Sequence, residues 1–282
     1  MSGPLVSVLM TSYNREKYIG VAIESVLAST YQNFELIIVD DGSKDDTVRI
    51  AKSYADKDSR VKVYQNPKNL GDYPNRNQAA AYATGKYLKY VDADDYIYPT
   101  GLETLINMME QFPTAGWGLC SLLQYYKQPF PFILSPKEAY EYNYLGPGIF
   151  HKAPLSAIIK KDVFNAVSGF NNIRMAGDFE MWNRLGQKYP VVLMPDGIVW
   201  YREHDAQEMN SYRKFVKLYA DIKMKYLLSD DCPLDKGAVK AVIKRSMASL
   251  RKEMLKSIIK MDIAAVKENL MIHNIHRNSI KS

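Results

Sequence analysis

The sequence predicts an α/β protein with a mixed, mostly parallel sheet flanked by helices and followed by a helical C-terminal extension. Short apolar runs alternate with segments of helical periodicity over the first hundred residues, and clusters of polar residues follow three of those runs. From about residue 207 the pattern is helical to the end. Alternating strands and helices imply right-handed crossovers, which place strands in parallel with helices on both faces of the sheet.

Four strands and three helices are expected in the first hundred residues. The run at 5–13 is apolar on both faces and too short for a helix, which is typical of a strand buried within a sheet. After it, Tyr18, Ala22 and Val26 recur at helical spacing. The expected strands are 5–13, 34–41, 60–66 and 86–95, and the expected helices are 15–29, 44–57 and 73–85.

The next hundred residues continue the alternation less regularly. Residues 124–157 are rich in Pro, Tyr and Phe and are interpreted as loop and short strands, a region where an acceptor could bind. The expected helices are 101–112, 160–167 and 177–189, and the expected strands are 114–123 and two within 191–202.

The C-terminal segment 207–282 is predicted to be a basic helical extension. From Arg213 onward there are 16 Lys/Arg against 7 Asp/Glu, a net charge of 16 − 7 = +9, so the remainder of this +6 chain carries about −3. This asymmetry fits either peripheral contact with an anionic membrane surface or phosphorylated acceptor, or a solvated helical face. Ile243, Met247 and Ile258 belong to an apolar stripe that favours core packing or a partner face over a membrane anchor.

The composition, 47% apolar and 24% charged over 282 residues, is that of a globular protein with a substantial core. With only Cys120 and Cys232, a disulfide framework is not expected. No leader pattern and no run of about 20 apolar residues is found, so we expect a cytoplasmic protein, peripheral at most to the inner membrane face. The basic segment lacks the regular aromatic interleaving of nucleic-acid binders.

Three polar clusters should meet at one edge of the sheet, because the carboxyl ends of parallel strands lie together. They are Thr11–Asn14, Asp40–Ser43 and Asp92–Asp95. The last holds three carboxylates, whose mutual repulsion a divalent cation relieves. Mg²⁺ and Mn²⁺ prefer such oxygen ligands together with substrate phosphates. The alternative is a solvated turn or a helix N-cap.

Two further features suit a nucleotide. Ser43 is explained as a helix cap, but capping does not account for the two carboxylates, Asp40 and Asp41, before Gly42. One of them could accept a base N–H or a ribose hydroxyl. Arg76, at the start of an expected helix, has the planar, permanent charge that suits a diphosphate, although a surface ion pair is the alternative.

These motifs, in this order, resemble the family 2 inverting glycosyltransferases, which have the Rossmann-like GT-A fold. The resemblance is dense over about residues 4–100 and sparser to about 205. It implies that Thr11, Tyr13 and Asp41 hold the nucleobase and that Arg76 approaches nucleobase or phosphate. It also implies that Asp92 binds the nucleotide, while Asp94 or Asp95 binds the metal that bridges the diphosphate.

The family's catalytic base is usually an acid in a Glu-Asp pair at the head of a helix. Asp178 takes that position here, while Gly177 replaces the usual Glu. Asp178 is therefore the expected base, with Glu180 in reserve and an N-cap as the structural alternative. A late family element resembles residues 200–204, so Arg202 or His204 would meet the diphosphate or the metal.

The resemblance implies a catalytic domain at 1–206, with a nucleotide-binding half (1–100) and an acceptor half (101–206). It implies transfer of a sugar, with inversion and with Mn²⁺ or Mg²⁺, from a nucleotide diphosphate sugar to a saccharide or lipid-linked acceptor. UDP is the expected nucleotide. A nucleotidyltransferase or a non-catalytic nucleotide-sugar binder is the alternative, but the former usually carries a Gly-rich loop where this chain has "TSYNREKY".

Overall fold

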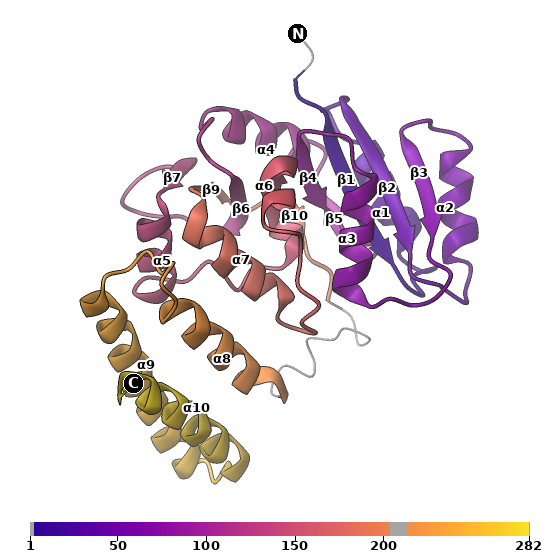
Figure 1. The fold of residues 1–282 in the computed structure, drawn as a ribbon. Coiled ribbons are helices and arrows are strands. Elements are labelled where there is room, and N and C mark those ends of the chain that lie inside the picture. The colour runs from indigo at the N-terminus through magenta and orange to yellow at the C-terminus, as the bar shows by residue number, and fades with distance from the viewer. Residues whose placement is uncertain (1–2, 204–213, 282) are drawn as a thin grey trace.

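The computed structural model describes residues 3–203 and 214–281 and confirms the α/β fold with its helical extension (Figure 1). Its main sheet has the strand order β3-β2-β1-β4-β8-β6-β9-β7, and β10 and β5 form a small second sheet. The strands are β1 (Val6–Ser12), β2 (Phe34–Asp40), β3 (Val61–Gln65), β4 (Tyr87–Tyr90), β5 (Tyr96–Ile97), β6 (Trp117–Leu122), β7 (Phe132–Leu134), β8 (Ala157–Lys160), β9 (Val191–Pro195) and β10 (Val199–Trp200).

Helices cover both faces of this sheet. They are α1 (Ile19–Leu27), α2 (Thr47–Ala55), α3 (Asp72–Tyr82), α4 (Gly101–Glu110), α5 (Pro136–Tyr144), α6 (Lys161–Ala166), α7 (Gly177–Lys188), α8 (Val216–Leu227), α9 (Lys236–Ile259) and α10 (Ile263–Lys281), with a 3₁₀ turn at Pro154–Ser156. Every helix expected from the sequence is present, with ends shifted by a few residues.

The half of the main sheet formed by β1 to β4 is parallel, as predicted. β1 lies between β2 and β4 and runs parallel to both, and β3 runs parallel to β2. In the other half β8 is antiparallel to β4 and β6, and β7 is antiparallel to β9. The sheet is therefore mixed, and the parallel strands bring the carboxyl ends of β1, β2 and β4 to one edge.

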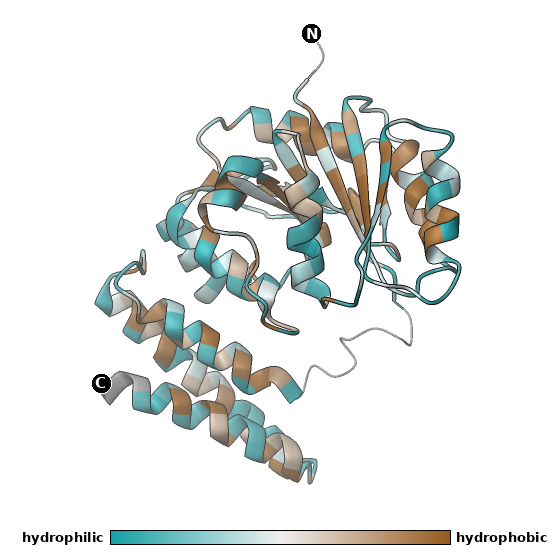
Figure 2. Ribbon diagram, turned by 45° about the vertical axis from the view of Figure 1, so that its right-hand side comes forward, coloured by the Kyte–Doolittle hydropathy of each residue, from teal (hydrophilic) through white to brown (hydrophobic). Residues whose placement is uncertain are grey.

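Two apolar cores lie on opposite faces of the sheet because successive side chains of a strand point to opposite sides. Met10 and Ile38 belong to the core under α1 and α4, whereas Leu9 and Ile37 belong to the core under α3 and α7. The hydropathy colouring shows the central strands as apolar and the outer helices as mixed (Figure 2). Strands apolar on both faces are what the continuous apolar runs of the sequence predict.

The interpretation of residues 124–157 as loop and short strands is incomplete. The helix α5 lies within this range, and it begins at a capping box in which Ser135 accepts from the Glu138 N–H and Glu138 accepts from the Ser135 N–H. A Ser followed three residues later by a Glu marks a helix start, so the signal was present in the sequence.

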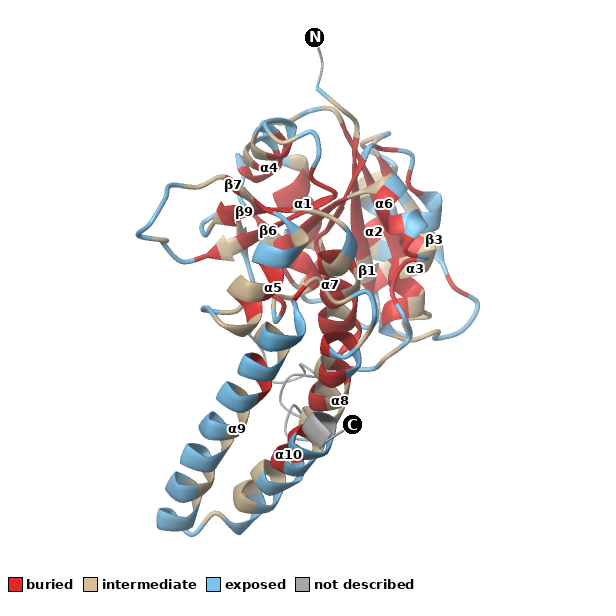
Figure 3. Cartoon of the chain, turned by 60° about the vertical axis from the view of Figure 1, so that its left-hand side comes forward, coloured by how far each residue is buried: buried red, intermediate tan, exposed pale blue. Residues whose placement is uncertain are grey.

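The described part of the C-terminal segment, residues 214–281, is mostly helical, as predicted. Helix α8 packs on α7, and α9 and α10 form a hairpin whose connecting turn lies far from the sheet (Figures 1 and 3). Among the described residues, none of the helices combines the length and apolarity that crossing a bilayer requires.

Candidate functional site

At the carboxyl edge of β1, β2 and β4, two side chains hold the carboxylate of Asp92 by hydrogen bonds. Thr11, near the end of β1, donates to Oδ1 of Asp92 at 3.0 Å. Arg76, on α3, donates from Nη1 and Nη2 to the two oxygens of Asp92, each at 2.7 Å. Such a paired contact fixes both side chains in one geometry. The structure therefore joins three of the residues predicted from the sequence.

Arg76 keeps its charge although it is buried. Burial works against the charged form, but Asp72 and Asp92 more than offset it and hold the pKa of Arg76 well above its usual value. Oδ1 of Asp72 lies 2.9 Å from Nε, and the guanidinium also lies over the ring of Tyr90. Arg76 is therefore not part of an exposed surface ion pair. It is a buried cation with a fixed position next to the polar edge of the sheet.

The two carboxylates after β2 both have structural partners. Asp40 accepts from Ser12 Oγ and from the N–H groups of Gly42 and Ser43, so it organises the turn, where Gly42 has a φ of 82°. Asp41 is buried, with one oxygen accepting from Asn66 and Leu70 N–H and the other from the Gly71 N–H. The proposed contact of Asp41 with a nucleobase would use the acceptor position that remains on that second oxygen.

The loop after β1 faces the acidic edge. Tyr13 is 44% exposed, which leaves its ring face available for stacking. Arg15 donates from Nε to Oδ2 of Asp94 at 2.7 Å and from Nη1 to the carbonyls of Tyr13 and Asn14. Arg15 lies in the segment "TSYNREKY", and no role for it was predicted from the sequence. In the structure it is a cation within contact of the acidic cluster.

Asp95 is the most perturbed carboxyl of the cluster. Burial, followed by the nearby charges of Asp92 and Asp94, raises its pKa to about 8. Its Oδ1 accepts from the N–H of Arg202 at 3.1 Å, and the Arg202 guanidinium donates to the Asp94 carbonyl at 2.9 Å. The structure thus places Arg202 against the cluster. Its predicted contact with the diphosphate or the metal stays a prediction, and His204 lies outside the described residues.

A divalent cation fits this cluster chemically. Burial, and then the charges of Asp92 and Asp94, raise the pKa of Asp95, and a cation would favour the ionised form of all three carboxyls. Across residues 3–203 and 214–281, however, no group of three or more His, Cys, Asp or Glu is arranged to hold a metal ion. An ion held at Asp94 or Asp95 would therefore take its other ligands from phosphate oxygens and water.

Asp178, the expected base, lies in the first turn of α7 close to the same edge. Its Oδ1 accepts from the Phe179 N–H at 2.7 Å, and its own N–H donates to the Tyr73 hydroxyl at 3.1 Å. Burial first, and Asp72 second, raises the pKa of Asp178 to about 6. The N-cap position of α7 is Ala176, so N-capping does not explain Asp178.

The ring of Tyr73 explains why glycine precedes Asp178. A Cβ on Gly177 would lie 2.6 Å from Cε2 of Tyr73, which is closer than any van der Waals contact allows. Tyr73 is buried on α3, one turn before Arg76. The ring thus takes the space where the family usually has a glutamate, and its hydroxyl holds the backbone of Asp178.

Glu180, the reserve candidate, has a structural role. It is 1% exposed and accepts from Asn171 at 2.7 Å, from the Tyr226 hydroxyl, and from Arg184 at 2.9 Å. Since Tyr226 is on α8, this carboxylate joins α8 to α7.

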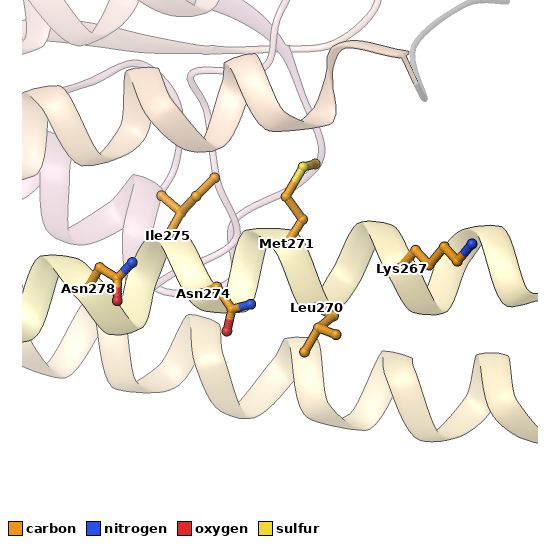
Figure 4. A pocket seen from close by; sticks show the side chains of 6 residues that line it. All are labelled: Lys267, Leu270, Met271, Asn274, Ile275 and Asn278. Carbon is orange, nitrogen blue, oxygen red and sulfur yellow. The ribbon is translucent and has the colours of Figure 1, made fainter.

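A surface hollow of about 440 Å³ lies elsewhere, along α10 (Figure 4). It is lined by Lys267, Leu270, Met271, Asn274, Ile275 and Asn278. All of these residues come from one helix, with Met271 and Ile275 on one side of it and Leu270 on the other. A hollow of this kind offers no converging carboxylates, so the candidate site remains the carboxyl edge of the sheet.

The sequence model of the family described as "Glycosyl transferase family 2" matches residues 7–168, which is more than half of the chain and includes the Asp92–Asp95 cluster. The chain belongs to glycosyl transferase family 2. It is 42% identical over 111 residues to an uncharacterised glycosyltransferase of Haemophilus influenzae. That match covers 39% of this chain and only 44% of the relative.

Solved structures share the fold of this family 2 glycosyltransferase. Staphylococcus aureus TarS (residues 1–349) in complex with UDP-GlcNAc superposes with a TM-score of 0.64 at 17% identity, covering 98% of this chain and 91% of that one. The mannosyltransferase PcManGT of Pyrobaculum calidifontis, in complex with GDP-Man and Mn²⁺, gives 0.62 at 15% identity, covering 99% and 87%. At such identities the likeness establishes the GT-A fold, as the sequence predicted.

Proposed function

We propose that this family 2 protein transfers a sugar from a nucleotide diphosphate sugar, with UDP as the expected nucleotide, to an acceptor hydroxyl with inversion. The observation that carries the proposal is the convergence on one sheet edge of Asp178, whose pKa is raised to about 6, the fixed Arg76–Asp92 pair and the Asp94–Asp95 cluster. TarS and PcManGT, which share the fold, were solved with UDP-GlcNAc and with GDP-Man and Mn²⁺.

In this mechanism Tyr13 stacks on the base, with Thr11 and Asp41 beside it. The Arg76–Asp92 pair holds the ribose or the phosphates. Asp94 and Asp95, with His204 of the following segment, would hold Mn²⁺ or Mg²⁺, which when bound neutralises charge on the diphosphate. Arg15 and Arg202 supply further positive charge next to the cluster.

Asp178 would take the proton from the acceptor hydroxyl as that oxygen attacks the anomeric carbon. A pKa near 6 leaves this carboxylate ionised at neutral pH, yet basic enough to accept a proton. Attack from the face opposite the leaving diphosphate gives inversion. The Tyr73 hydroxyl, bonded to the Asp178 N–H, would fix the direction of the carboxylate.

The replacement of the family's usual glutamate by Gly177 does not argue for a non-catalytic binder. The ring of Tyr73 occupies the space of the missing side chain. Glycine at position 177 is therefore explained by local packing, and Asp178 stays in place. We propose that residues 1–206 form the catalytic domain and 207–282 an extension. The acceptor would be a saccharide or lipid-linked molecule of polysaccharide or glycolipid synthesis, and the free thiols of Cys120 and Cys232 suit the cytoplasm.

The experiment that tests this function is donor turnover without an acceptor. The protein is incubated with UDP-sugars and Mn²⁺, and UDP release to water is followed, with the anomeric configuration of the freed sugar read by NMR. We expect slow, metal-dependent hydrolysis with inversion. UDP release that is equally fast before and after chelation of the metal would contradict the proposal. So would retention of the anomeric configuration in the freed sugar.

A further inference from the structure

The far end of the α9–α10 hairpin exposes a cluster of large apolar side chains. We call residues 252–263 the hairpin tip, and its exposed apolar residues are Leu255, Ile258, Ile259, Met261 and Ile263. Ile259 and Met261 are 82% and 86% exposed. Isolated apolar residues on a surface need no explanation, but five within nine positions form a patch of the kind that marks an interaction site.

The apolar stripe of α9 continues beyond the point where the chain packs against it. Ile243 is buried and Met247 packs against the core. Further along the same helix Ile258 is 58% exposed. The stripe was predicted to pack in the core or to face a partner; its first half packs against the core, and its end is exposed. The apolar side chains of α9 that lie near the domain are covered by the chain itself, whereas those at the tip would have to be covered by a different partner.

Met261 occupies a backbone position that favours glycine. Its φ is 57°, its N–H donates to the Ile258 carbonyl at 3.0 Å, and the Asp262 N–H donates to the Ser257 carbonyl at 2.9 Å. These two bonds form a Schellman motif, in which the left-handed residue is usually Gly because a side chain is strained there. Since Met261 is exposed, burial within the chain does not offset that strain.

Basic residues lie beside these apolar side chains. Lys252, Lys256 and Lys260 are exposed at spacings of four on the last turns of α9. Residues 236–281 hold 11 Lys/Arg against 3 Asp/Glu, a net charge of 11 − 3 = +8. A second copy docking tip to tip would bring these like charges together, which disfavours self-association. An anionic lipid surface attracts them.

We propose that the hairpin tip docks the protein peripherally on an anionic lipid bilayer. The apolar side chains of the tip enter the boundary between headgroups and acyl chains, and the lysines meet the lipid phosphates. An apolar face flanked by lysines is the composition of helices that lie in the membrane interface. The docking does not depend on the proposed transfer reaction. The basic charge of the whole segment already fits contact with an anionic membrane. The proposal adds that the contact is made by the hairpin tip and its apolar residues.

The experiment is co-sedimentation of the full chain with phosphatidylglycerol vesicles and with phosphatidylcholine vesicles. The wild type should bind the former and leave the latter. Replacing the three lysines together (K252Q/K256Q/K260Q) should lower the affinity about 100-fold, since about 1 kcal/mol is lost for each and 1.4 kcal/mol is tenfold. Ile258→Ser with Ile259→Ser should lower it at least tenfold. Leu123→Ser is the matched control, because Leu123 is 81% exposed on another surface, and it should bind as the wild type does.

Met261→Gly separates the proposal from a purely structural role of the tip. It relieves the left-handed strain, so the melting temperature should stay equal or rise while vesicle binding weakens. A variant that loses stability and keeps vesicle binding would overturn the proposal. So would equal binding to both lipids, or a wild-type dimer in light scattering that Ile258→Ser with Ile259→Ser dissociates. UDP titration of each protein keeps the two proposals apart, since a wild type that binds nucleotide but no vesicle overturns this inference alone.

Discussion

The carboxyl edge of the sheet and the hairpin tip depart from the usual pattern of burial in opposite directions. At the edge, ionisable groups such as Arg76 and Asp95 are buried. At the tip, apolar groups such as Ile259 and Met261 are exposed. The buried charges mostly find partners within the chain, as in the Arg76–Asp92 pair. The exposed apolar groups at the tip have no such compensation, so their partner is expected to come from outside.

The largest expected effect tests whether Asp178 acts chemically or only structurally. Asp178→Asn should lower UDP-sugar turnover on the order of 10³-fold while nucleotide affinity stays near wild type, because only the proton acceptor is lost. Asp162→Asn is the matched control, since Asp162 lies in the first turn of α6 and also accepts from the next N–H, at 2.8 Å. If both variants lose activity equally, Asp178 is not the base.

Glu180 should show the opposite behaviour. Glu180→Ala removes the partner of Arg184 and Tyr226 inside the core, which we expect to lower the free energy of unfolding by about 3 kcal/mol. Thermal or urea unfolding measures this loss. Turnover per folded molecule should change little. A stable Glu180→Ala protein without turnover would move the base from Asp178 to Glu180.

The Tyr73–Gly177 contact predicts a smaller effect. Gly177→Ala puts a methyl group 2.6 Å from the Tyr73 ring, so we expect a loss of about 1–3 kcal/mol in stability and a displaced Asp178. Adding Tyr73→Ala should restore part of the stability but not the turnover, since the hydroxyl that holds the Asp178 backbone is gone. A Gly177→Ala protein as stable and active as the wild type would contradict the packing described.

The smallest effect is in the pH dependence. Because the pKa of Asp178 is raised to about 6, kcat/KM for donor hydrolysis should fall about tenfold for each pH unit below 6. The Asp178→Asn profile should lack this limb. For stability the sign is reversed, since a raised folded-state pKa means that ionising this carboxyl destabilises the fold above pH 6. That cost disappears as the pH falls from 6 towards the ordinary value of 3.8. A wild-type profile flat down to pH 5 would separate Asp178 from the rate.

The sequence predicted the edge of the sheet better than it predicted the contacts made there. Apolar runs that end in polar residues identify β1, β2 and the loop after β4, because a buried parallel strand and a polar carboxyl end leave separate marks in the sequence. The contact of Tyr73 with Gly177 joins positions more than a hundred residues apart, and no spacing rule reveals it. The helix α5 was missed although its capping box was visible.

The hairpin tip is a second place where the sequence predicts a feature of the chain but not its contacts. The stripe on α9 predicts which face of the helix is apolar, and Ile243 and Ile258 share that pattern. Which of the two is buried depends on how far the hairpin extends from the domain (Figure 3). Periodicity therefore identifies an apolar face but does not say whether the chain itself covers it.

The measurement that tests the central claim most directly is calorimetric titration of UDP, GDP and dTDP, each with and without Mn²⁺, with Mn²⁺ alone as a reference. Because the proposed metal would share its ligands between the Asp94–Asp95 cluster and the diphosphate, we predict weak binding of the metal alone and tight binding of one nucleotide only when the metal is present. Asp94→Asn with Asp95→Asn should abolish that dependence. A folded protein that binds none of the three nucleotides, with or without Mn²⁺, would contradict the assignment of this edge as a donor site.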